Sequence, residues 1–149
     1  MPQSLWTGHL FVMEYRKFVK KDRSNYNTEG LKHLYWELFD SPDAEGSGYR
    51  FMEREPVLIL DDILSEEPDW KLKVQTAYCS KPYADILGLP AQSPFRVGKA
   101  IKLRATNPKL RMFIVRHLIL RGVTRIGIGR EHIYFDTDNY LYKDALYVQ

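Results

Sequence analysis

The fold depends on two stretches, Ser93-Pro-Phe-Arg-Val-Gly-Lys-Ala-Ile-Lys-Leu103 and Glu131-His-Ile-Tyr-Phe-Asp136. Apolar and polar residues alternate within each, which predicts strands over 97–103 and 132–136, the first entered from a loop. Gly98 lies inside the first strand and predicts a close approach by another backbone segment. A further short strand is expected over 125–129, joined to the second stretch by a tight turn.

Helices are expected on either side of these strands. Between the two stretches, Asn107 is placed to cap a helix that has Pro108 in its first turn and Gly122 at its C-terminal cap. Apolar residues at helical spacing predict helices over 28–39, capped by Asn27 or Thr28, and over 56–64. A short helix is expected over 83–87, a loop over 41–48, and further strands over 71–79 and 144–149. This order predicts an α+β fold with a mostly antiparallel sheet and flanking helices.

The chain has 149 residues, of which 44% are hydrophobic and 13% aromatic, and this suits one globular domain with its own core. We expect a single domain over 1–149, with an N-terminal helical or arm region over about 1–50, a core over about 56–136 and a C-terminal extension over 137–149. Cys79 is the only cysteine, so no internal disulfide can form, which fits a reducing compartment. Neither a signal peptide nor a membrane span is expected, because the start lacks a basic and apolar leader and no apolar run approaches ~20 residues.

Charge is distributed unevenly along a chain whose net charge is only +3. Eleven acids and two bases lie within 37–69, whereas eleven bases and one acid lie within 81–130. The two segments could neutralise each other within one fold or lie on opposite solvated faces. Alternatively, the subunit is polarised, and its acidic face docks on the basic face of a neighbour. Nucleic acid is not expected as a partner, because the bases are spread out and form no recognisable reading motif.

The two stretches resemble the zinc D-alanyl-D-alanine carboxypeptidase family, whose fold is shared by the hedgehog signalling domain. That family carries Ser-x-His-x-x-Gly-x-Ala-x-Asp on the first stretch and Glu/Asp-x-x-His-x-Asp on the second, separated by a helix of suitable length. The resemblance covers about 56–136 and implies a hedgehog/DD-peptidase-like fold. Small members of the family without a signal peptide are commonly phage-encoded, so the resemblance also implies a phage origin.

The zinc-ligand positions of that family hold other residues here. By resemblance, the first histidine falls on Phe95, the aspartate on Lys102 and the last histidine on Tyr134. Zinc binds deprotonated nitrogen, sulfur or oxygen donors, of which phenylalanine offers none. A lysine ammonium repels the ion, and a tyrosine phenol with an ordinary pKa of about 10 is a poor ligand at neutral pH. The resemblance therefore implies neither a metal site nor a cofactor in this chain.

The arginine that binds the substrate carboxylate in the family is replaced as well. It belongs to a Ser-Gly-Tyr-Arg-Ser strand end, whose counterpart here is Thr76-Ala-Tyr-Cys-Ser80, so Cys79 takes its place. A thiol cannot donate the two parallel hydrogen bonds of a guanidinium, although the adjacent Lys81 offers a point charge. Two acids remain: Glu131 at the position of the family's general base and Asp136 at its second acidic position.

We expect the positions of the lost site to form a metal-free and non-catalytic cluster. Lys102 is expected to pair with Glu131 or Asp136, because an unpaired carboxylate in a partly buried pocket is costly. Phe95 and Tyr134 are expected to fill the volume that metal and water occupy in the family.

Three other chemical interpretations deserve a test. His132, Asp136 and Asp138 could bind a divalent ion weakly, although a strand histidine beside a solvated acidic loop explains them equally. Cys79 could act as a nucleophile only with a base nearby, and the sequence places none. Ser80 and Lys81 are adjacent, so on a strand they would face opposite sides and could not act together.

These substitutions predict a DD-peptidase-like pseudoenzyme that serves as a structural or assembly subunit of a phage virion, in its capsid, neck or tail. Its partners would be other protein subunits, either copies of itself or virion proteins, and not a membrane. Its location would be the virion, or the host cytoplasm before assembly. Two alternatives stay open: a module that binds peptidoglycan peptides without hydrolysis, and an active zinc carboxypeptidase or endolysin with unusual ligands.

Overall fold

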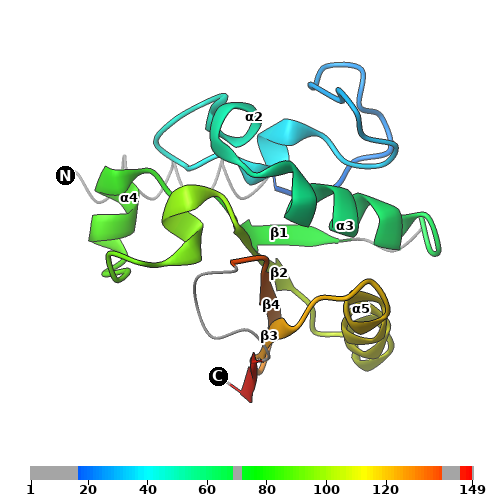
Figure 1. Cartoon of the computed structure of the whole chain (residues 1–149). Coiled ribbons are helices and arrows are strands. Elements are labelled where there is room, and N and C mark those ends of the chain that lie inside the picture. Colours follow the sequence, from blue (N-terminus) through cyan, green and yellow to red (C-terminus); the bar gives the residue numbers. More distant parts are fainter. Residues whose placement is uncertain (1–16, 69–71, 139–144, 149) are drawn as a thin grey trace.

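A five-stranded sheet with strand order β1-β2-β4-β3-β5 runs through the centre of the protein (Figure 1). The computed structural model describes residues 17–68, 72–138 and 145–148. β1, β2, β4 and β3 pair antiparallel, whereas β5 lies parallel to β3 at the edge. The strands are β1 (Lys73–Thr76), β2 (Ala100–Arg104), β3 (Arg125–Ile128), β4 (His132–Asp136) and β5 (Ala145–Val148).

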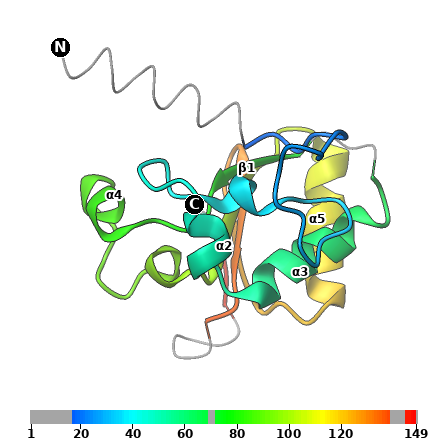
Figure 2. The same ribbon diagram turned by 90° about the horizontal axis from the view of Figure 1, so that it is seen from above.

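Helices cover both faces of this sheet. Figure 2 shows α3 and α5 on one side of the strands and α4 on the other. The α-helices are α2 (Ser47–Phe51), α3 (Arg54–Leu64), α4 (Lys81–Ile86) and α5 (Pro108–Leu120), and the 3-10 helices are η1 (Trp36–Phe39) and η2 (Pro94–Val97).

The two faces of the sheet differ in chemistry because side chains alternate along each strand. Ile101, Leu103 and Phe135 are fully buried and belong to the same core as Leu60 of α3 and Ile114 of α5. The opposite face carries the polar positions of the same strands. The candidate site lies on this polar face.

The mixed α/β architecture predicted from the sequence is confirmed at the level of a four-stranded antiparallel sheet with flanking helices. Helix α5 begins as predicted: the Asn107 side chain accepts hydrogen bonds from the N–H groups of Lys109 and Leu110, at 2.8 and 3.2 Å. Gly122 follows its C-cap residue with φ 81°, a left-handed conformation that glycine adopts without strain. The predicted edge strand over 144–149 is present as β5, although residues 144 and 149 lie outside the described residues.

The helix predicted over 28–39 is wrong, because only Trp36–Phe39 form a helix, of the 3-10 type. Gly30 has φ 74°, which interrupts helical geometry. The N–H groups of Lys32, His33 and Leu34 donate to the buried carboxylate of Asp61 on α3, at 2.8 to 2.9 Å. These N–H groups therefore donate to a side chain distant in the sequence and not to the backbone carbonyls that a local helix would use.

Other boundaries also differ from the prediction. The strand expected over 71–79 is confined to Lys73–Thr76, and the short helix expected over 83–87 is α4, over Lys81–Ile86. The strand expected from residue 97 begins only at Ala100, because residues 94–97 form η2. The loop expected over 41–48 ends in α2, whose N-terminal residues are held by Asp40: its carboxylate accepts from the N–H groups of Gly46 and Gly48, at 3.0 and 2.8 Å. Gly98 does approach another backbone, since a Cβ there would lie 2.1 Å from the carbonyl oxygen of Phe51.

The predicted N-terminal region over 1–50 falls partly outside the described residues. From Lys17 onward it packs on the sheet: the N–H of Val74 donates to the Lys17 carbonyl, and the N–H of Val19 to that of Leu72, both at 3.1 Å. Within the described part of the chain, no helix is both long and apolar enough to span a membrane.

Candidate functional site

A buried ionic cluster lies at the end of β4, on the polar face of the sheet. The Asp136 side chain is completely inaccessible, and its Oδ1 accepts from Arg125 Nε at 2.8 Å and from the Asp138 N–H at 3.1 Å. The hydroxyl of Tyr134 donates to Asp136 Oδ2 at 2.5 Å. Hydrogen-bond donors from three other residues thus surround the carboxylate.

The ring of Phe95 packs against the Tyr134 ring of this cluster. Its centroid lies 5.4 Å from that of Tyr134, in an edge-to-face arrangement with an interplanar angle of 67°. The short helix η2 positions the ring, because Ser93 Oγ accepts from the Phe95 N–H at 3.3 Å and the N–H of Cys79 donates to the Phe95 carbonyl at 2.9 Å. Phe95 and Tyr134 therefore meet, as expected.

The predicted pairing of Lys102 is wrong. Lys102 lies opposite Tyr134 in the register of β2 and β4 and forms an ion pair with neither of the two expected acids. Glu131 is exposed and pairs with Arg104 at 3.7 Å. Arg125 instead neutralises Asp136, because the β3–β4 register places these two residues directly opposite each other.

Arg125 was missed by the sequence reasoning, although a signal for it was available. A tight turn between strands over 125–129 and 132–136 brings their outer ends together, so the first residue of one faces the last residue of the other. The resemblance instead favoured Lys102, because it falls on a metal-ligand position of the family.

The Cys79 side chain is buried, and its thiol is expected to react slowly. Its Sγ contacts the carbonyl oxygen of Ala77 at 3.6 Å, and burial raises the pKa of the thiol to about 11. A thiol with this pKa is almost entirely protonated at neutral pH, so it is a poor nucleophile. The next residue, Ser80, caps α4, and its hydroxyl donates to Asp43. The Lys81 side chain is exposed and pairs with Asp85.

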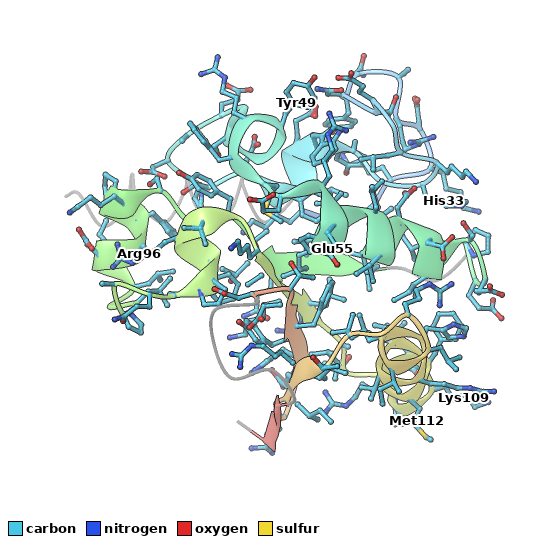
Figure 3. The ribbon with its side chains drawn as sticks, in the orientation of Figure 1. His33, Tyr49, Glu55, Arg96, Lys109 and Met112 are labelled. Carbon is cyan, nitrogen blue, oxygen red and sulfur yellow. The ribbon has the colours of Figure 1, made fainter. Side chains whose placement is uncertain are left out.

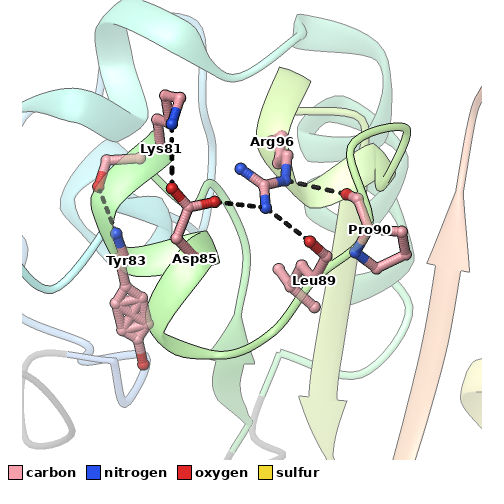
Figure 4. Close-up of polar contacts among 7 residues, drawn as sticks. Lys81, Tyr83, Asp85, Leu89, Pro90 and Arg96 are labelled. Atoms are coloured by element: carbon pink, nitrogen blue, oxygen red, sulfur yellow. Dashed lines mark hydrogen bonds and ion pairs between the residues drawn. The ribbon is translucent and has the colours of Figure 1, made fainter.

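A pocket of about 450 Å³ lies beside the cluster, between α4 and η2, and Figure 4 shows the polar contacts at its wall. The guanidinium of Arg96 donates to Asp85 at 2.8 Å and to the carbonyls of Leu89 and Pro90 at 2.6 and 2.9 Å. Lys81 Nζ lies 3.0 Å from the same Asp85 carboxylate. Arg96 and Lys81 hold the pKa of Asp85 below its usual value. The pocket therefore has a charged wall in which both cations are paired with Asp85.

A second pocket, of about 270 Å³, is lined in part by Arg125 and Asp136. Glu55 and Ile59 of α3 form one side, and Asp138 lies near the end of β4. Among the described residues, no three histidine, cysteine or carboxylate side chains are placed to hold a metal ion, and this includes His132, Asp136 and Asp138. The arrangement of Asp136 explains this result in part, because its oxygens already accept from Arg125, Tyr134 and the backbone.

Comparison with known proteins gives no relative: no family model, no curated protein and no solved structure matches this chain.

Proposed function

We propose that this chain is a non-catalytic protein of the hedgehog/DD-peptidase type and serves as an assembly subunit of a phage virion. The observation that carries the proposal is the interlocked cluster of Phe95, Tyr134, Asp136 and Arg125. The resemblance puts two zinc ligands at Phe95 and Tyr134, and here the two rings pack edge to face with their centroids 5.4 Å apart. The ring edge and phenol fill the space that a metal and its bound water would need.

The environment of Asp136 also supports the loss of chemistry. A general base must be able to reach a substrate proton, but Asp136 is inaccessible and already accepts three hydrogen bonds. Glu131, at the position of the family's general base, is exposed and paired with Arg104. Neither acid is therefore placed to activate a water molecule at Tyr134.

The surface supports a role in assembly. Several large apolar side chains of α5 are well exposed: Met112 at 77%, Leu120 at 66% and Ile119 at 57%. Exposed apolar side chains that gather in patches are typical of protein–protein contacts.

Metal analysis and a hydrolysis assay together test the proposal. Protein purified without chelator is expected to contain no stoichiometric zinc, and with added zinc it is expected to leave a peptide ending in D-Ala-D-Ala intact. A known zinc carboxypeptidase, assayed in parallel, is the positive control. One zinc per chain together with release of D-alanine would overturn the proposal and favour the active enzyme.

One observation favours a second candidate, a module that binds peptidoglycan peptides. The pocket between α4 and η2 is lined by Lys81 and Arg96, for which a peptide carboxylate would compete with Asp85. Sedimentation with and without purified peptidoglycan separates the two functions. An assembly subunit sediments equally in both samples, whereas a binding module sediments more with peptidoglycan and loses this excess on Lys81→Ala.

A further inference from the structure

The outer face of helix α5 carries apolar side chains that no described element covers. Met112 is 77% exposed and Ile119 57%, whereas Ile114 and Leu118 on the opposite face are buried in the core. Figure 3 shows Met112 and Lys109 pointing away from the sheet. This helix is therefore apolar on its outer side as well as its inner side, which is typical of a helix with a further packing partner.

Charge on this face is of one sign. Lys109, Met112, Arg116 and Ile119 follow one another at intervals of three, four and three residues, so they share one face of the helix. We name these four residues the basic stripe. Lys109 and Arg116 are both exposed, and helix α5 contains no acidic residue. A partner for this stripe should therefore combine an apolar residue with carboxylates.

Helix α3 carries a surface of that chemistry. Glu55, Leu58 and Asp62 follow one another at intervals of three and four residues, and Leu58 is 44% exposed. Glu66 lies just beyond the helix. We name these four residues the acidic stripe. Arg121 pairs with Asp62 at 2.8 Å and with Glu66 at 3.7 Å, so one guanidinium balances only one of three carboxylates.

We propose that the basic stripe of one copy of the chain binds the acidic stripe of a second copy. In this contact Met112 and Ile119 pack against Leu58, while Lys109 and Arg116 face the carboxylates. The matching three-and-four spacing lets both helices present apolar residues beside charges, and the charges of the two helices are opposite in sign. The inference rests on the assembly function proposed above and names its partner as the chain itself.

In the proposed contact the basic stripe of each subunit binds one neighbour and its acidic stripe binds another, so the contact is heterologous. A heterologous contact leaves one basic stripe and one acidic stripe free at the ends of each pair of subunits, and further copies can add there. Assembly is therefore expected to continue into a ring or an open array as the protein concentration rises.

Two complementary variants test the contact directly by light scattering. Met112→Ser with Ile119→Ser disables the basic stripe, and Glu55→Ser with Leu58→Ser disables the acidic stripe. Each variant alone is expected to be monomeric, because every contact needs one intact stripe of each kind. An equimolar mixture is expected to form a heterodimer of twice the monomer mass and to stop there.

Ile86→Ser is the matched control, because Ile86 is 63% exposed but lies on α4, on the other side of the sheet. It is expected to assemble as the wild type does, and circular dichroism checks that all variants fold. A wild type that stays monomeric at every concentration would overturn the inference, as would variants that assemble alone or fail to form the mixed dimer. A metal-free monomer would remove this contact but leave the proposed function standing, whereas zinc-dependent hydrolysis would remove the proposed function whatever the mass.

Discussion

At the scale of single residues, the buried Arg125–Asp136 pair is the feature most sensitive to substitution. Asp136→Asn keeps the shape of the side chain but removes the charge that balances Arg125, whose side chain is only 12% exposed. Breaking a buried ion pair in this way destabilises a protein by about 3–5 kcal/mol. Chemical denaturation is expected to show a loss of this size in the free energy of unfolding.

Glu131→Gln supplies the control, because it breaks an ion pair of which both side chains are about half exposed. Exposed pairs contribute about 1 kcal/mol or less. Equal losses for the two substitutions would show that Asp136 does not hold a buried charge in place.

The thiol of Cys79 provides a second test at this scale. Because its pKa is raised to about 11, it should remain protonated and react slowly with disulfide reagents at pH 8, then react fast once the protein is denatured. A folded-state pKa above the unfolded value stabilises the protein below the ordinary pKa of about 9, and that stability is lost as the pH rises from about 9 towards 11. A Cys79→Ala variant should lack this component of the alkaline decline. Fast labelling of the native protein at pH 8 would contradict the buried position.

The sequence predicted which residues form the cluster around Tyr134, but not which residue pairs with Asp136. Phe95, Lys102 and Tyr134 were predicted to share one place, and the structure brings Phe95 onto Tyr134 and Lys102 opposite it. The charge partner of Asp136 was predicted wrongly, because ion pairing depends on strand register. Residue types and motif spacing do not determine that register.

At the scale of secondary-structure elements, Asp61 connects helix α3 to the segment before η1. Its buried carboxylate accepts from three consecutive backbone N–H groups, those of Lys32, His33 and Leu34. Asp61→Ala leaves these donors without their acceptor, which should cost about 3 kcal/mol in the free energy of unfolding. Thermal or chemical denaturation measures the loss.

Asp62→Ala is a close control, since it lies on the same helix but its side chain is 65% exposed and pairs with Arg121. Its expected cost is about 1 kcal/mol at most. If Asp61→Ala were as mild as Asp62→Ala, the segment over 32–34 would not depend on α3 for its conformation.

The same contacts explain which elements could be predicted. Helix α5 carries its own signals, with Asn107 as the cap, Pro108 in the first turn and Gly122 after the end, so local chemistry predicts it. The segment over 28–39 has the apolar spacing of a helix, but three of its N–H groups donate to Asp61 instead of to helical carbonyls. Asp61 lies far away in the sequence. A residue at such a distance cannot be assigned as an acceptor from periodicity.

At the scale of the whole molecule, the sheet separates two kinds of chemistry. Its apolar face builds the core with α3 and α5, and its polar face holds the cluster of the candidate site. The uneven charge of the sequence is partly neutralised within the fold, since Arg121 of the basic segment pairs with Asp62 and Glu66 of the acidic one. Exposed charges of both signs remain on α3 and α5, as the proposed contact between copies requires.

The polar face also permits a direct test of whether these positions derive from a metal site, as the resemblance implies. Phe95→His, Lys102→Asp and Tyr134→His together restore the ligand set that the resemblance implies, at positions that already meet: residues 95 and 134 are in ring contact at 5.4 Å, and 102 lies opposite 134. Zinc needs its nitrogen and oxygen ligands at about 2.0–2.2 Å, so binding requires all three introduced side chains to converge on one point. The triple variant is expected to bind one zinc ion per chain in elemental analysis.

The double variant that retains Lys102 should bind at least about tenfold more weakly, because its ammonium repels the ion. A triple variant that folds by circular dichroism but binds no zinc would show that these three positions do not form a degenerate metal site.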